Sequence, residues 1–323
     1  MNDIYSQVWT TETSAIPPDL AVEPELFKIL CFLGTLGIIL NILNIVTLSM
    51  STEQVTYKIL LGMTVADLLV NITLFCISII FQTSPNTVKI YHIMPISLIS
   101  ILMRLFASIS NWSAVLMATI RLLVVTFPLK AAIYASPKRV KVSIGLIYIL
   151  CIGLQVLFYA MVAYWLGILS NFALLLYVFP ILFEILPMAV CLVLTVMLLI
   201  QFGRAHAKAK NLVSQTQMDE RVKEQRKLTF TSLLTLTFFI ITYLPLVIHE
   251  LIDLANMYSI NASNRYPTTT HILSKVTLIL QSCNHTGNFF IYITANSTLR
   301  KNFLQKFAKV KTAVCAGRTA SSV

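Results

Sequence analysis

Long uncharged runs separated by clusters of charge dominate the chain. No residue between Lys28 and Glu53 is charged, and the run from Ile59 to Val88 carries only Asp67. A helix needs about 20 apolar residues to cross a hydrocarbon layer about 30 Å thick, and each run is long enough for one crossing. The pattern therefore predicts two membrane-spanning helices in the first part of the chain.

Five more spans follow from the same pattern. The third extends from about Ile93 to Thr126, with Arg104 and Arg121 as its charged residues. The stretch from Val142 to Gly203 carries only Glu184 and is so long that it must fold back once, which gives spans four and five. The last two are the uncharged runs Leu228–His249 and Val276–Leu299. The prediction is an all-α membrane protein, a bundle of seven transmembrane helices.

The residues after the seventh span predict one more, shorter helix. Leu299, Phe303 and Phe307 recur at every fourth position with basic residues between them. This spacing is typical of an amphipathic helix that lies on the surface of the inner leaflet. A frayed basic tail is the alternative interpretation.

Composition and charge support this topology. Hydrophobic residues make up 57% of the 323 residues and charged residues only 11%, and the mean hydropathy is +0.80. Most of the 24 Lys and Arg residues fall on one side of the spans. Because cytoplasmic loops are rich in these residues, we expect an extracellular N-terminus in a multi-pass protein of the plasma membrane. The net charge of +11 then reflects topology and contact with membrane lipid, and no nucleic acid partner is expected.

Three regions follow from this. Residues 1–28 are acidic before their single Lys and contain Pro17-Pro18, so we expect a disordered extracellular N-terminus without a cleavable signal peptide. Residues 29–296 form the seven-transmembrane domain. Residues 297–323 hold the amphipathic helix and a cytoplasmic tail.

Motifs on five of the spans resemble those of rhodopsin-like (class A) G-protein-coupled receptors. They are Gly37-xxx-Asn41 on the first span, Thr64-Val65-Ala66-Asp67-Leu68-Leu69 on the second, Ile120-Arg121-Leu122 on the third, Phe239-Ile240-Ile241-Thr242-Tyr243-Leu244-Pro245 on the sixth and Asn288-Phe289-Phe290-Ile291-Tyr292 on the seventh. Within the family, the third-span and seventh-span motifs look most like invertebrate FMRFamide-type neuropeptide receptors and nematode class W serpentine receptors.

The resemblance implies a receptor that converts extracellular ligand binding into activation of a heterotrimeric G protein through movement of the sixth span. Its activation switch would include Arg121, Phe239, Pro245 and Tyr292. Pro245 removes a backbone donor and bends its helix into a lever, although a static kink is the simpler interpretation. The ligand is a neuropeptide or, alternatively, a small chemosensory molecule.

Several departures from the family pattern change these expectations. The acidic residue that normally precedes Arg121 is Ile120 here, and we hypothesise higher basal signalling, with Glu224 as a substitute partner for Arg121. The outer end of the third span has no Cys, so no extracellular disulfide is expected. Thr195 stands where the family usually has Tyr.

The resemblance also implies a polar cluster around the buried Asp67, which can hold a sodium ion in this family. Its members would be Asn41, Ser110, Asn284 and Asn288. A buried carboxylate needs polar partners in a bilayer, and the alternative is a set of interhelical hydrogen bonds without any ion. No other cofactor or metal is expected.

The candidates for ligand binding are four charged residues in the outer parts of the spans, Arg104, Glu184, Glu250 and Lys275, together with Tyr243 on the sixth span. Arg104 and Glu184 either receive a charged ligand group or form a structural ion pair. Glu250 belongs to an acidic rim that suits a basic peptide or is simply solvated.

Two modifications are predicted, and three other functions are disfavoured. Asn261-Ala262-Ser263 is an extracellular glycosylation sequon, and Cys315 is a candidate for acylation. The sequence contains no His-Glu-xx-His, Gly-x-Ser-x-Gly or phosphate-binding Gly loop, so no enzyme is expected. A transporter would show internal repeats, and an opsin would need a Lys deep in span seven.

Overall fold

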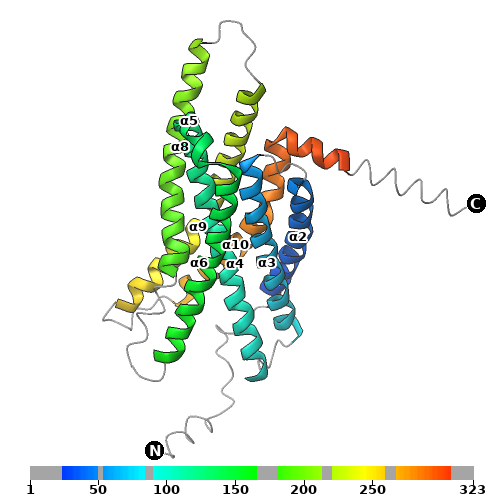
Figure 1. Ribbon diagram of the computed structural model, residues 1–323. Helices are drawn as coiled ribbons and strands as arrows, with labels where there is room; N and C mark the ends of the chain where they lie inside the picture. Colours follow the sequence, from blue (N-terminus) through cyan, green and yellow to red (C-terminus); the bar gives the residue numbers. More distant parts are fainter. Residues whose placement is uncertain are drawn as a thin grey trace, which may run out of the picture.

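The computed structural model describes residues 24–49, 54–83, 90–165, 180–212, 220–258 and 267–306, and within these ranges the secondary structure is helical, with no strand. The long helices run side by side as a bundle (Figure 1). In chain order the elements are α2 (Pro24–Ser49), α3 (Val55–Thr83), α4 (Ile90–Thr126), α5 (Pro128–Tyr134), α6 (Pro137–Trp165), η2 (Ile181–Ile185), α8 (Leu186–Leu212), α9 (Glu220–Tyr258) and α10 (Pro267–Ala295).

Six of the helices are long and apolar enough to cross a membrane by length and composition. They are α2, α3, α4, α6, the η2–α8 unit and α9. The seventh long helix, α10, is more polar because its buried side carries residues such as Thr277, Ser282, Asn284, His285 and Asn288. It packs against α2, α3 and α9 as a full member of the bundle. The predicted seven-helix membrane bundle is confirmed.

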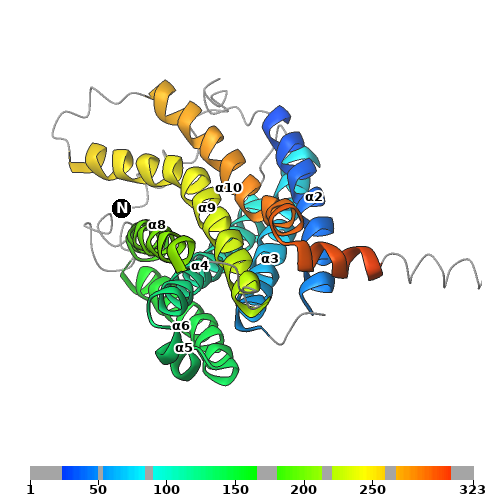
Figure 2. The same ribbon diagram turned by 90° about the horizontal axis from the view of Figure 1, so that it is seen from above.

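α4 lies at the centre of the bundle. It contacts α3, α6, α8 and α9, and the view along the helices shows α2 and α10 on one side of it and α6 and α8 on the other (Figure 2). α9 contains Pro245 and changes direction along its length in the same view. A change in the position of α4 can therefore affect several helices at once.

Two local elements were not predicted. The short helix α5 follows α4 after Phe127, with Pro128 in its first turn, where a proline costs no hydrogen bond. The fifth span begins with the π-helical turn η2, which places Glu184 in a wider turn than an α-helix has. Such turns occur often at functional sites, because they rotate side chains out of the regular helical register.

A helix at residues 297–306 follows α10 directly and runs at a steep angle to it (Figure 1). Asn296 caps it, because its side-chain oxygen accepts hydrogen bonds from the backbone N–H groups of Thr298 (3.1 Å) and Leu299 (3.2 Å). Leu299 is buried, and the Phe303 ring meets Phe289 edge to face at 5.5 Å. The short amphipathic helix is confirmed up to residue 306, and Phe307 lies outside the described residues.

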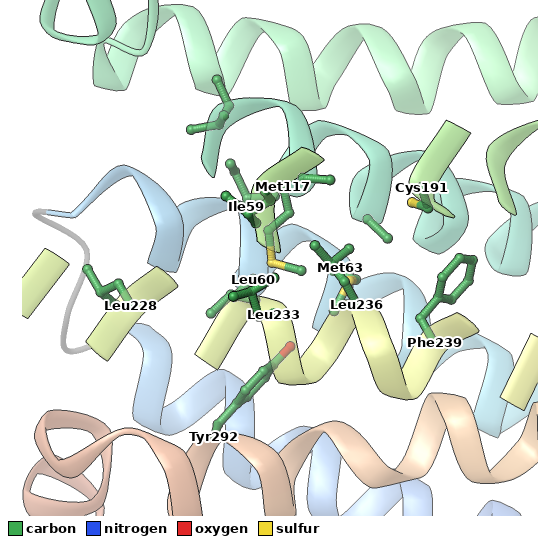
Figure 3. Close-up of a cluster of buried hydrophobic side chains, with 14 of the residues drawn as sticks. Ile59, Leu60, Met63, Met117, Cys191, Leu228, Leu233, Leu236, Phe239 and Tyr292 are labelled. Carbon is green, nitrogen blue, oxygen red and sulfur yellow. The ribbon is translucent and has the colours of Figure 1, made fainter. Parts of the chain in front are cut away.

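The end of the bundle that holds Arg121 also holds α5 and the 297–306 helix, and α8 and α9 extend beyond the other helices there (Figure 1). We call it the Arg121 end, and the opposite end the Glu184 end. Apolar side chains from α3, α4, α9 and α10 fill the core next to the Arg121 end, and Figure 3 shows Met63, Met117, Leu236 and Tyr292 among them.

Candidate functional site

Asp67 on α3 is completely buried and accepts three hydrogen bonds. Ser110 Oγ on α4 donates to its Oδ1 (2.6 Å), and Asn288 Nδ2 on α10 donates to its Oδ2 (2.9 Å). The third partner is His285 Nδ1, also on α10, at 2.7 Å from Oδ1. The carboxylate thus ties α3, α4 and α10 together.

A second layer of amides surrounds this contact. Asn71 and Asn41 each donate from Nδ2 to the His285 backbone carbonyl, at 3.1 Å and 2.9 Å. Thr286 Oγ1 donates to Asn71 Oδ1 (3.2 Å). A Cβ atom at Gly37 of α2 would overlap the side-chain amide of Asn71 on α3. The absence of a side chain at Gly37 therefore leaves room for this amide between the two helices.

The structure places three of the predicted cluster residues at Asp67 or at its partner His285. Ser110 and Asn288 contact the carboxylate, and Asn41 contacts the His285 backbone. Asn284 does not reach Asp67: its Oδ1 accepts a hydrogen bond from Thr242 Oγ1 of α9 at 3.2 Å. Asn284 therefore links α10 to the sixth span instead.

Sequence reasoning missed His285, the partner closest to Asp67 after Ser110. A signal was present, because His285 lies three residues before Asn288 and so on the same face of the helix. A histidine inside a membrane span is rare and needs a polar partner. The other carboxylate partners, Ser110 and Asn288, were found because the resemblance to the family implies these positions, and it implies no role for this histidine.

The residues at Asp67 do not fit a sodium ion in this arrangement. Both carboxylate oxygens already accept hydrogen bonds, and the His285 ring stands against Oδ1, where a cation would need to bind. The Asn284 oxygen, another expected ligand, is engaged by Thr242. In this structure the predicted cluster residues form interhelical hydrogen bonds with one another and with His285 and Thr242.

Arg121 on α4 is also buried, with 1% of its surface exposed, but its partners are few. Its Nη1 donates to Gln225 Oε1 of α9 at 3.3 Å. Its Nε and Nη2 have no hydrogen-bond partner within the described residues. A guanidinium has five N–H donors, so most of its capacity is unused in this state.

The prediction that Glu224 pairs with Arg121 is wrong, because the neighbouring residue Gln225 accepts the hydrogen bond from Arg121. One position along a helix turns the side chain by about 100°, which is enough to take Glu224 away from Arg121. A neutral amide replaces the expected carboxylate. At Arg121, the restraint between α4 and α9 is therefore one hydrogen bond to a neutral acceptor.

At the Glu184 end, Arg104 of α4 and Glu184 of η2 form an ion pair with 3.7 Å between Nη1 and Oε1. The Glu184 side chain is 10% exposed and the Arg104 side chain 46%. Glu250 of α9 lies close enough to interact electrostatically with both. Two carboxylates thus surround one guanidinium, and Glu184 Oε2 has no hydrogen-bond partner in the part of the chain that is described.

Tyr243 on α9 connects the Glu184 end to the core. Its hydroxyl accepts hydrogen bonds from Asn111 Nδ2 of α4 (3.0 Å) and Gln281 Nε2 of α10 (3.1 Å). Asn111 also donates to the Phe183 carbonyl of η2 (3.2 Å). Tyr243 was expected to contact ligand, but its side chain is fully buried and its partners are protein groups.

The remaining predicted residues are placed as follows. The Phe239 ring stacks on the Tyr243 ring with 4.9 Å between their centroids, and Pro245 follows Tyr243 two residues later on α9. Tyr292 is buried in the apolar core. Lys275 lies half-buried on α10. Asn261 and Cys315 lie outside the described residues.

Comparison with known proteins agrees with this architecture. A search of curated proteins found no significant match. One family model, described as 7 transmembrane receptor (rhodopsin family), matches residues 40–292, which is most of the chain. Its members are receptors and not enzymes, and they transmit an extracellular signal to a G protein. The chain therefore belongs to the rhodopsin family of seven-transmembrane, G-protein-coupled receptors.

Proposed function

We propose that this receptor sits in the plasma membrane with the Glu184 end outside, binds a neuropeptide there, and activates a heterotrimeric G protein at the Arg121 end through movement of α9. The observation that carries the proposal is the pair of cations on α4. Arg104 and Arg121 are 17 residues apart, about 25 Å along one helix. One lies in a charged, partly exposed site, and the other is buried with unused donors.

The charge at the Glu184 end favours a ligand with a basic group. Arg104 pairs with Glu184 and also interacts with Glu250, so the site holds one more carboxyl group than guanidinium group. His249 Nδ1 and Asp253 Oδ2 lie next to it at 3.4 Å from each other. A cationic peptide group can replace Arg104 at Glu184 and use the unpaired Oε2 atom.

A path for the signal starts at the same residue. Glu184 belongs to η2, and the Phe183 carbonyl of η2 binds Asn111, which binds Tyr243. A shift of η2 on ligand binding would therefore change the position of Tyr243 on α9. Because Pro245 lies two residues further along α9, a small change there swings the distant Arg121 end of the helix.

At the Arg121 end, outward movement of α9 would break the single bond between Gln225 and Arg121. The guanidinium then faces the opened crevice with all its donors unused. The C-terminal helix of a Gα subunit ends in backbone carbonyls without intrahelical partners, and these are suitable acceptors. We propose this contact as the coupling step.

The neuropeptide assignment further rests on two sequence motifs. Asn288-Phe289-Phe290-Ile291-Tyr292 and Ile120-Arg121-Leu122 resemble those of FMRFamide-type receptors and nematode class W receptors. The acidic residues of the Glu184 end favour peptides with a basic residue. A small chemosensory ligand is the competing outcome of the test below.

The test is a screen of amidated peptides, with and without a basic residue, and of small odorants, on cells that express the receptor, with calcium and cAMP readouts. For a peptide agonist, we expect Glu184→Gln to lower potency by about tenfold or more, as the loss of a charge-assisted contact predicts. The matched control is Asp253→Asn, which also removes one negative charge nearby.

Surface expression of each variant, measured on an epitope tag, separates binding from folding. A loss of potency in Glu184→Gln at unchanged surface level supports the ligand role. Equal potency of wild type and Glu184→Gln, or agonism by neutral odorants alone, would contradict the basic-peptide proposal.

A further inference from the structure

A groove on the outside of the bundle runs between α3 and α6. Its volume is about 540 Å³. The walls come from both helices: Lys58, Leu61, Gly62 and Val65 of α3, and Lys141, Ile144 and Tyr148 of α6. We call it the two-lysine groove. It lies at the Arg121 end, because α3 and α6 both begin there.

The two walls repeat the same order of side chains. Lys58 lies three residues before Leu61 and seven before Val65, and Lys141 lies three residues before Ile144 and seven before Tyr148. Positions three and seven residues apart share one face of a helix. Each wall therefore presents an ammonium group first and apolar or aromatic side chains up to about 10 Å deeper into the bilayer.

The floor of the groove depends on Gly62. A Cβ atom there would lie 3.1 Å from Ile144 Cγ2, so a larger residue would crowd α6. The Tyr148 hydroxyl donates to the Gly62 carbonyl at 2.8 Å and fastens the two helices at the deeper part of the groove. Gly62 and this hydrogen bond therefore set the distance between α3 and α6 along the groove.

The two ammonium groups are available for a ligand. Lys58 is half-buried and Lys141 exposed. Neither has an ion-pair or hydrogen-bond partner among residues 24–49, 54–83, 90–165, 180–212, 220–258 and 267–306. Both ammonium groups line the same groove, so an anion that enters it can be attracted by both.

We propose that the two-lysine groove binds one anionic phospholipid of the inner leaflet. The lipid phosphate would lie between Lys58 and Lys141, and one acyl chain would follow Leu61, Val65 and Ile144 toward Tyr148. The charge and the apolar wall together demand a molecule with an anion at one end and hydrocarbon at the other. A zwitterionic lipid supplies the chain without the net charge, and inorganic phosphate supplies the charge without the chain.

The inference rests on the proposed orientation, with the Arg121 end at the inner leaflet, and it is independent of the ligand and G protein proposed above. The test uses full-length receptor in nanodiscs of phosphatidylcholine with a minor fraction of phosphatidylglycerol. Native mass spectrometry of the released receptor counts retained lipids. We expect retained phosphatidylglycerol far above its share of the nanodisc lipid.

Lys58→Gln combined with Lys141→Gln should lower this retention by about tenfold or more, because each Lys near the membrane surface contributes about 1 kcal/mol to binding of anionic lipid. The matched control is Lys130→Gln with Lys301→Gln, which removes the same charge from two exposed positions at the same end. We expect the control to retain lipid like the wild type.

Two results would overturn the proposal. One is retention of the two lipids in the ratio of the nanodisc. The other is an equal loss of phosphatidylglycerol in the groove variant and in the control, which would mean general surface charge and no specific groove. A groove variant with the thermal unfolding midpoint of the wild type in phosphatidylcholine alone establishes that folding is intact.

Discussion

Asp67 and Arg121, two of the buried charged residues in the described bundle, differ in how well they are paired. Asp67 is enclosed by donors from two neighbouring helices, and each of its oxygens accepts at least one hydrogen bond. Arg121 is equally buried but has one partner, a neutral amide at 3.3 Å, and two nitrogens without any in the described structure.

The difference indicates which parts of the bundle hold their place and which move. A fully paired buried charge is costly to disturb, whereas a poorly paired one makes its state easy to leave. The Asp67 cluster therefore holds α3, α4 and α10 as one unit. The contact between α4 and α9 at Arg121 is the weak one, and α9 is the helix that the proposed mechanism moves.

The largest effect is expected from Asp67→Ala. This change leaves Ser110, His285 and Asn288 as buried donors without their acceptor, and removal of one partner from such a site costs about 3–5 kcal/mol. We expect a large drop in the thermal unfolding midpoint in detergent and little receptor at the cell surface. Asp67→Asn, which keeps one acceptor oxygen, should fall between Asp67→Ala and wild type.

Arg121→Gln comes next and should act on signalling, not on folding. The variant keeps an amide that can bond Gln225 but removes the charge, so we expect G protein activation to fall by about 10- to 100-fold, as for loss of a charge-assisted hydrogen bond. Nucleotide exchange on purified G protein measures this. Because a poorly paired buried charge is removed, the unfolding midpoint should stay level or rise; a sharp fall would contradict the comparison.

A smaller effect is expected from Gln225→Glu, which sharpens the contrast by giving Arg121 the carboxylate it lacks. Glu has the shape of Gln, and its charge should strengthen the existing contact by about 1 kcal/mol. Ligand-free signalling should then fall several-fold. Gln225→Ala is the matched control and should raise it. This pair is preferable to Ile120→Asp, because Ile120 is buried in the apolar core.

The smallest effect concerns sodium. In wild type, replacing sodium with choline should leave the unfolding midpoint unchanged, because His285 occupies the side of Asp67 that an ion would need. His285→Ser should create a sodium response of about 1 kcal/mol or less, the linkage expected for an ion near its dissociation constant. A sodium-dependent midpoint in wild type would show that the ring moves aside, and would refute our interpretation of this site.

The spans were predictable because their signal is one-dimensional. The length of each uncharged run matches the thickness of the membrane, and the four-residue spacing of Leu299 and Phe303 indicates one face of a helix. Both features can therefore be found from the sequence before any contact is known. The positions of Asp67, Ser110 and Asn288 in one cluster were predictable only through the resemblance to the family.

The contacts that differ from the expectations are set by packing between helices. Gln225 rather than Glu224 meets Arg121 because of the rotation of α9, and charge patterns contain no information on that rotation. His285 lies in no family motif. The π-turn at Glu184 widens a helix by local backbone hydrogen bonding, which hydrophobic periodicity does not detect.

The polar side of α10 has a consequence for how the receptor is made. Among the long helices of the described bundle, α10 alone is too polar to qualify as a span by its own hydropathy. We therefore expect that the translocon inserts it poorly into lipid in the absence of the other helices. Its Asn284, His285, Thr286 and Asn288 side chains pair with groups on helices synthesised earlier. Integration of the final segment should therefore await its neighbours, and a defect in any of them would expose the nascent receptor to quality control in the endoplasmic reticulum.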